Sequence, residues 1–111
     1  MTTTTSDQIR AAGALMSLLT ALPHLPAPNV QLEHLKVPGT PEYAWGINVS
    51  LHHGLDHFEQ WRQALGLDPA DVDHQHHATT AWLTVTGTHS GVPLVLHGYY
   101  RHNPDQTGDE R

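Results

Sequence analysis

Two stretches of the chain carry apolar residues at helical spacing. Between Ser6 and Leu22 the apolar positions recur at steps of three and four, which predicts an amphipathic helix. It is expected to begin at Thr5 or Ser6, because Thr5 and Gln8 fit a capping box, and Pro23 ends it. Its predicted buried stripe comprises Ile9, Ala12, Leu15, Met16, Leu19 and Leu22. The same reasoning predicts a second helix from Leu55 or Asp56 to Leu65, followed by a capping glycine, Gly66.

Four other stretches alternate apolar and polar residues, as half-buried strands do. Strands are expected at Asn29–Val37, Tyr43–His52, Thr79–Thr86 and Val92–Arg101. In the first of them the alternation changes phase after Glu33, which predicts either a bulge near His34 or burial of both sides. A loop at 87–91 joins the last two strands, and the segment 66–77 is expected to be a loop as well.

The predicted order is helix, strand, strand, helix, strand, strand. Short connections make each strand pair an antiparallel hairpin. The expected fold is therefore an α+β two-layer sandwich, with a four-stranded antiparallel sheet and both helices on one face. The length of 111 residues fits a single domain. We assign this domain to residues 6–102, between a disordered polar thread at 1–5 and a flexible tail at 103–111.

Composition narrows the possible partners. The net charge is −6 with only five Lys and Arg, so no basic surface for nucleic acid is expected. Cysteine is absent, which excludes disulfides and thiol catalysis. No apolar run reaches the ~20 residues of a membrane span, and the N-terminus lacks the basic region of a signal peptide. We predict a cytoplasmic protein without a nucleic-acid or membrane partner.

The outer side of the last hairpin is the first candidate site. Its inward residues are apolar, whereas its outward residues combine aromatic and uncharged side chains. The outward set comprises Trp82, Thr84, Val95, His97 and Tyr99. Thr-rich outer faces are also normal in strands that contact only water. We nevertheless favour a protein interface, because Trp and Tyr among uncharged neighbours are typical of interface cores.

The eleven histidines suggest a second candidate, a site for zinc or another divalent transition metal. His53 and His57 have the i, i+4 spacing that puts two rings on one helical face, and His74 and His76 alternate along an extended segment. The candidate ligands are His53, His57, His74, His76 and His77. Gly54 argues against helix at residue 53, and such pairs are common in His-rich loops, so solvated histidines are favoured over a metal site.

Known catalytic motifs are missing from the sequence. The nucleophile elbow Gly-x-Ser-x-Gly, HExxH, GxGxxG and the P-loop do not occur, although an acid–base pair needs only spatial proximity. We therefore expect a binding protein rather than an enzyme, with no catalytic residue.

Three stretches resemble small actinobacterial and actinophage hypothetical proteins, a group with no established activity. They are LPHLPAPNVQL (22–32), DHFEQWRQALGL (56–67) and the hairpin that starts WLTVTG and ends GVPLVLHGYY (82–100). The resemblance implies an origin in a mobile genetic element and supplies no site residue.

Taken together, the sequence predicts a small non-catalytic protein-binding or regulatory module. The expected partner is a second copy of the chain, in a homodimer, or another protein, bound through the outer side of the sheet. The alternative is a divalent-metal-binding protein or a small metal-dependent enzyme that uses the histidines.

Overall fold

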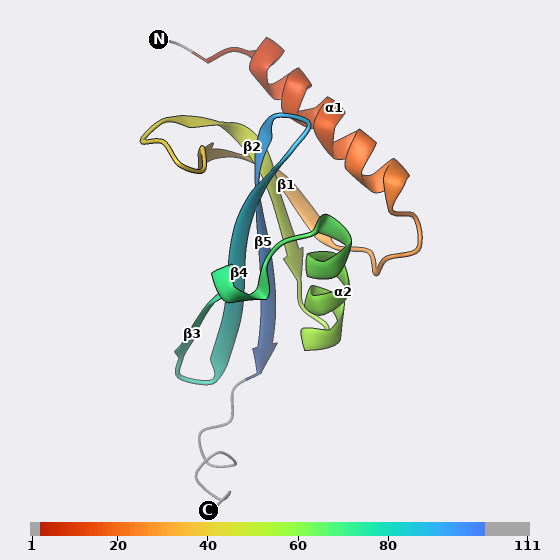
Figure 1. Ribbon diagram of the computed structural model, residues 1–111, viewed down its shortest axis with the longest axis vertical. Coiled ribbons are helices and arrows are strands. Elements are labelled where there is room, and N and C mark those ends of the chain that lie inside the picture. The colour runs from red at the N-terminus through yellow and green to blue at the C-terminus, as the bar shows by residue number, and fades with distance from the viewer. Residues whose placement is uncertain (1–2, 102–111) are drawn as a thin grey trace, which may run out of the picture.

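The computed structural model describes residues 3–101 and contains two α-helices and a five-stranded sheet (Figure 1). Along the chain the elements are α1 (Thr5–Ala21), β1 (Asn29–Lys36), β2 (Tyr43–Leu51), α2 (Leu55–Leu65), the 3₁₀-helix η1 (Pro69–Asp71), β3 (Asp73–His77), β4 (Thr80–His89) and β5 (Val92–Arg101). The α+β class is as predicted. The tail predicted at 103–111 lies outside the described residues.

The sheet is mixed, so the predicted four-stranded antiparallel sheet is wrong. Its strand order is β1-β2-β5-β4-β3, and β2 pairs with β5 in parallel. Both predicted hairpins exist: β1 pairs with β2, and β4 with β5, in antiparallel fashion. The two hairpins join through β2 and β5, which makes β5 a central strand. The pairing of β2 with β5 starts at Leu94, one residue after Pro93. The missing N–H of Pro93 therefore does not interrupt the hydrogen bonds between these two strands.

Strand β3 was predicted to be loop. All five of its side chains, from Asp73 to His77, are exposed, so it has no alternation of apolar and polar residues to reveal it. It forms an antiparallel hairpin with β4 through a tight turn in which Ala78 has a φ of 55°. Its formation depends on the backbone edge that β4 offers, which is a tertiary contact.

Strand β1 is regular. Its register with β2 runs without interruption from Asn29 opposite Ser50 to Lys36 opposite Tyr43, so the predicted bulge near His34 does not occur. The change of phase instead places Leu35 on the sheet side that faces away from the helices. There it helps to enclose Gly46, where an added Cβ would lie 3.0 Å from Leu35 Cδ1 and 2.3 Å from the Pro93 carbonyl oxygen.

Helix α1 packs on the sheet through another stripe than the one predicted. Ala11, Ala14 and Leu18 are buried, whereas Ile9 and Met16 are 70% and 67% exposed. Of the predicted stripe, Leu15 and Leu22 do pack against the core. Apolar residues lie on both sides of this helix. The side chains of Ala11 and Ala14 are small, so the helix backbone can approach the sheet closely on that side. The cap also differs, since the Asp7 carboxylate accepts a hydrogen bond from the Thr4 N–H at 2.8 Å.

Helix α2 covers the same sheet side and packs against β5. Phe58 and Trp61 are fully buried there, and Trp61 Nε1 donates to the Pro26 carbonyl at 2.8 Å. Gly98 permits this packing, because an added Cβ would lie 2.7 to 2.9 Å from Phe58 atoms. One core cluster includes residues from both helices and from the inner sides of β2, β4 and β5.

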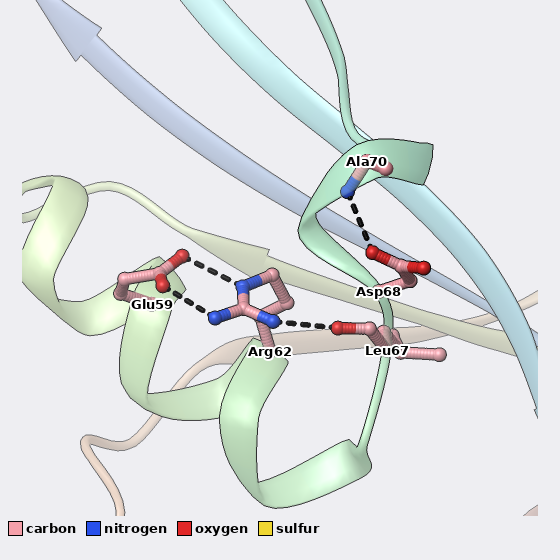
Figure 2. A network of polar contacts seen from close by, with 5 residues as sticks. All are labelled: Glu59, Arg62, Leu67, Asp68 and Ala70. Atoms are coloured by element: carbon pink, nitrogen blue, oxygen red, sulfur yellow. Dashed lines mark hydrogen bonds and ion pairs between the residues drawn. The ribbon is translucent and has the colours of Figure 1, made fainter.

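The end of α2 is tied to the chain that follows it (Figure 2). The Arg62 guanidinium binds both Glu59 carboxylate oxygens, at 2.8 and 2.5 Å, and donates to the Leu67 carbonyl at 2.6 Å. This ion pair lowers the pKa of Glu59 and raises that of Arg62. Asp68 caps η1 by accepting from the Ala70 N–H at 2.8 Å. These hydrogen bonds fix the segment that connects α2 to β3.

The β4–β5 turn is tighter than the loop expected at 87–91. Strand β4 continues to His89, and only Ser90 and Gly91 form the turn, with φ angles of 52° and 76°. Two consecutive positive φ angles are typical of the type I′ turn that suits the twist of a hairpin.

Candidate functional site: the open face of the sheet

Within residues 3–101, α1 and α2 lie on one side of the sheet and leave the other side uncovered. We call this second side the open face. The strand register places the five predicted interface residues together at its centre. In this register Trp82 lies opposite Tyr99, Thr84 opposite His97, and Val95 next to His97 along β5. These five residues therefore share one face of the sheet, and their role as an interface stays a prediction.

The aromatic residues of the open face form a continuous group. The Tyr99 ring lies 6.5 Å from Trp82 and 5.9 Å from His97, measured between ring centroids. On its other side Tyr99 stacks on His52, at 4.8 Å with an angle of 4° between the ring planes. Offset stacking of this kind fixes both rings and makes a flat aromatic surface. His52 was not predicted as part of the site. It lies one residue beyond the end of β2 and continues the outward-facing positions of that strand.

Val95 is unusual because it is only 8% exposed although no helix covers it. Its register neighbours on the open face are Thr86 of β4 and Asn48 of β2. Packing of the Thr86 and Asn48 side chains against Val95 within the sheet layer accounts for the burial of Val95. The centre of the open face is thus a closely packed surface rather than a groove.

His97 is half-buried in the middle strand. The Thr84 hydroxyl lies 3.0 Å from His97 Nδ1, within hydrogen-bonding distance. Burial lowers the pKa of His97, and the negative charge of Glu33 opposes this effect only in part. The imidazole is therefore neutral at pH 7, and protonating it costs more than protonating an exposed histidine.

The flanks of the open face are more polar than the sequence suggested. The Glu33 carboxylate accepts a hydrogen bond from the Asn48 amide, and the Ser50 hydroxyl donates to the Asn48 side-chain oxygen at 3.0 Å. On the opposite flank the Gln75 amide donates to the Asp73 carboxylate at 2.9 Å. Glu33 and Asp73 come from β1 and β3, the two edge strands. Only the strand order reveals that acidic residues border the uncharged centre.

The histidines proposed as metal ligands are not brought together. His53 and His57 lie near each other before and within α2, with ring centroids 6.2 Å apart. His74, His76 and His77 are on β3, at the far edge of the sheet. His74 Nε2 lies 2.6 Å from the Tyr100 hydroxyl. Among residues 3–101, no group of three or more His, Cys, Asp or Glu side chains is arranged to hold a metal ion.

No family model, curated protein or solved structure matches the chain. The similarity to actinobacterial and actinophage proteins therefore stays a prediction. Neither helix within residues 3–101 has the combination of length and apolar character that a membrane span requires.

Proposed function

We propose that this protein is a non-catalytic binding module that forms a homodimer through the open face of its sheet. The observation that carries the proposal is an uncovered sheet side with packed aromatic residues at its centre, Trp82 and Tyr99 among them. Large aromatic anchors surrounded by uncharged neighbours are typical of the residues that dominate binding energy.

The dimensions of the open face suit a stable dimer. Five strands at ~4.8 Å spacing, each with about eight residues at ~3.3 Å, cover roughly 600 Å² in projection. Standard interfaces bury about 800 Å² of accessible surface per partner, which is of the same order. Sheets commonly pack face to face at about 10 Å, with side chains of the two layers interdigitating.

The charge distribution also favours this face. Its centre is uncharged, while Glu33 and Asp73 lie on the edge strands and Arg101 ends β5. Interfaces are depleted of charge at the core and polar at the rim, which is the same arrangement. A second copy of the chain is the proposed occupant, and another protein is the alternative.

The test is the oligomeric state of the full chain and of Trp82→Glu, measured by native mass spectrometry and by light scattering after size exclusion. The wild type is expected to be a dimer at micromolar concentration. Trp82→Glu is expected to be a folded monomer, because a buried carboxylate without a partner opposes association. A monomeric wild type, or a dimeric Trp82→Glu, would contradict the proposal.

Met16→Glu is the matched control, because Met16 is an exposed apolar residue on the side of α1 away from the sheet. It is expected to leave the dimer intact. If Met16→Glu becomes monomeric while Trp82→Glu stays dimeric, the contact is made by α1. Adding zinc to the same samples tests the metal alternative. That alternative requires zinc to bind to the wild type and to be lost when His74 and His76 are replaced.

A further inference from the structure

A cavity of about 470 Å³ is lined by residues of the start of α1, the β1–β2 hairpin and the β4–β5 turn. The ribbon brings the start of α1 and the β4–β5 turn together at one end of the molecule (Figure 1). The cavity is open to solvent on one side. This volume falls within the range of ~300–1,000 Å³ typical of small-molecule sites. The sequence offered no hint of it, because its lining comes from three separate segments.

One wall of the cavity is aromatic. His34 of β1 lies directly opposite Trp45 of β2, with ring centroids 5.6 Å apart, and Tyr43 is 6.2 Å from His34. Tyr43 is 61% exposed, so its ring is accessible to a ligand. Val92 and Pro93 add apolar surface from the β4–β5 hairpin. Such a wall favours a flat apolar group over a hydrated one.

Arg10 supplies a positive charge to the same cavity. Its guanidinium reaches the β4–β5 turn, where Nη2 would lie 3.5 Å from a Cβ placed on Gly91. Within residues 3–101 the ion pair present is Arg62–Glu59, and Arg10 has no hydrogen bond to a side chain or carbonyl beyond its own helix. Asp7, one turn earlier, is occupied by the Thr4 N–H at 2.8 Å. As far as the described part of the chain is concerned, the guanidinium donors of Arg10 are therefore available to a ligand.

The other charges of the lining restrict the ligand further. Asp7 and Glu42 also border the cavity; the Asp7 carboxylate accepts from the Thr4 N–H, and both carboxylates are exposed and therefore screened by water. A phosphate or another multiply charged anion would meet two carboxylates and a single cation. A ligand with one negative charge can pair with Arg10 at a smaller electrostatic cost.

We propose that this cavity binds a small monocarboxylic acid with a flat apolar ring. The ring lies against Trp45 and Tyr43, and the carboxylate accepts hydrogen bonds from Arg10. Arginine suits this role because its planar guanidinium matches a carboxylate in a bidentate arrangement. The site is separate from the open face, so its occupancy does not depend on the dimer.

The test uses indole-3-acetate as the probe and NMR of the tryptophan indole N–H signals as the site-resolved readout. The chain has three tryptophans, and Trp45→Phe identifies the signal of Trp45. Indole-3-acetate is expected to shift the Trp45 signal and to leave those of Trp61 and Trp82 in place. Indole-3-acetamide and tryptamine share the ring but carry no negative charge, and they are expected to bind roughly tenfold more weakly or worse.

Arg10→Gln is expected to weaken indole-3-acetate binding by about tenfold or more, and an unchanged Trp61 signal reports that the variant is folded. Arg101→Gln removes the same charge at the opposite end of the sheet and is expected to have no effect. The proposal is overturned if the acid shifts no signal, if it shifts Trp82 instead of Trp45, or if tryptamine binds as tightly as the acid. Equal binding to Arg10→Gln would overturn it as well.

Discussion

The two sides of the sheet use aromatic residues in opposite ways. On the helix-covered side Phe58 and Trp61 are fully enclosed, and Phe58 packs closely against β5 at Gly98. On the open face Trp82 and Tyr99 are of similar size but remain half-exposed, packed only against neighbours in the same layer. Burial against another layer contributes most of the stability of a domain, because it removes the largest apolar area from water. The covered side therefore holds the fold, and the open face is the side on which the proposed dimer would form.

The adjacent leucines of α1 give the sharpest test of this comparison. Leu18 is 1% exposed against the sheet, whereas Leu19 is 36% exposed on the flank of the helix. Leu18→Ala is expected to lower the free energy of unfolding by about 2–5 kcal/mol, because it leaves a cavity in the core. Leu19→Ala is expected to cost less than about 1 kcal/mol. Chemical denaturation of both variants measures the difference, and equal losses would show that the covered layer is not where the stability resides.

Two glycines test how closely the layers are packed. Gly98→Ala would place a Cβ 2.7 to 2.9 Å from Phe58 atoms, so α2 must move away from β5. We expect the free energy of unfolding to fall by about 1–3 kcal/mol, as for other overpacked cores. In Gly13→Ala, the control, the added Cβ meets no atom within 4 Å, and a gain of about 0.5–1 kcal/mol is expected from helix propensity. Thermal unfolding distinguishes them, and a neutral Gly98→Ala would mean that the layers are loosely joined.

His97 tests the open face with a smaller effect. Because burial lowers its pKa in the folded state, the unfolded chain binds the proton more tightly. Stability is therefore expected to fall as the pH drops below about 6.5, the usual histidine value, and to recover as the pH rises. The difference in unfolding free energy between wild type and His97→Gln, measured from pH 5 to 8, isolates this residue from the other histidines. A pH-independent difference would contradict the burial of His97.

Local patterns in the sequence determined most of the elements and the centre of the candidate site. Alternation along β4 and β5 identified Trp82, His97 and Tyr99 as neighbours on one face, because the register of a hairpin follows from its turn. The capping glycine Gly66 adopts the left-handed conformation expected of it, with a φ of 70°. These features depend on residues close together in the chain.

Only the tertiary structure decided how these elements combine. The parallel pairing of β2 with β5 joins distant segments, so no local pattern encodes it. The exposed strand β3 forms only because β4 offers an edge for pairing. Helix α1 has apolar residues on more than one side, so packing against the sheet determines that the side with Ala11 and Ala14 is the buried one. The acidic borders of the open face and the cavity at Arg10 follow from that assembly. Sequence periodicity specifies which face of a segment is apolar, whereas strand order and layer spacing depend on contacts between segments far apart in the chain.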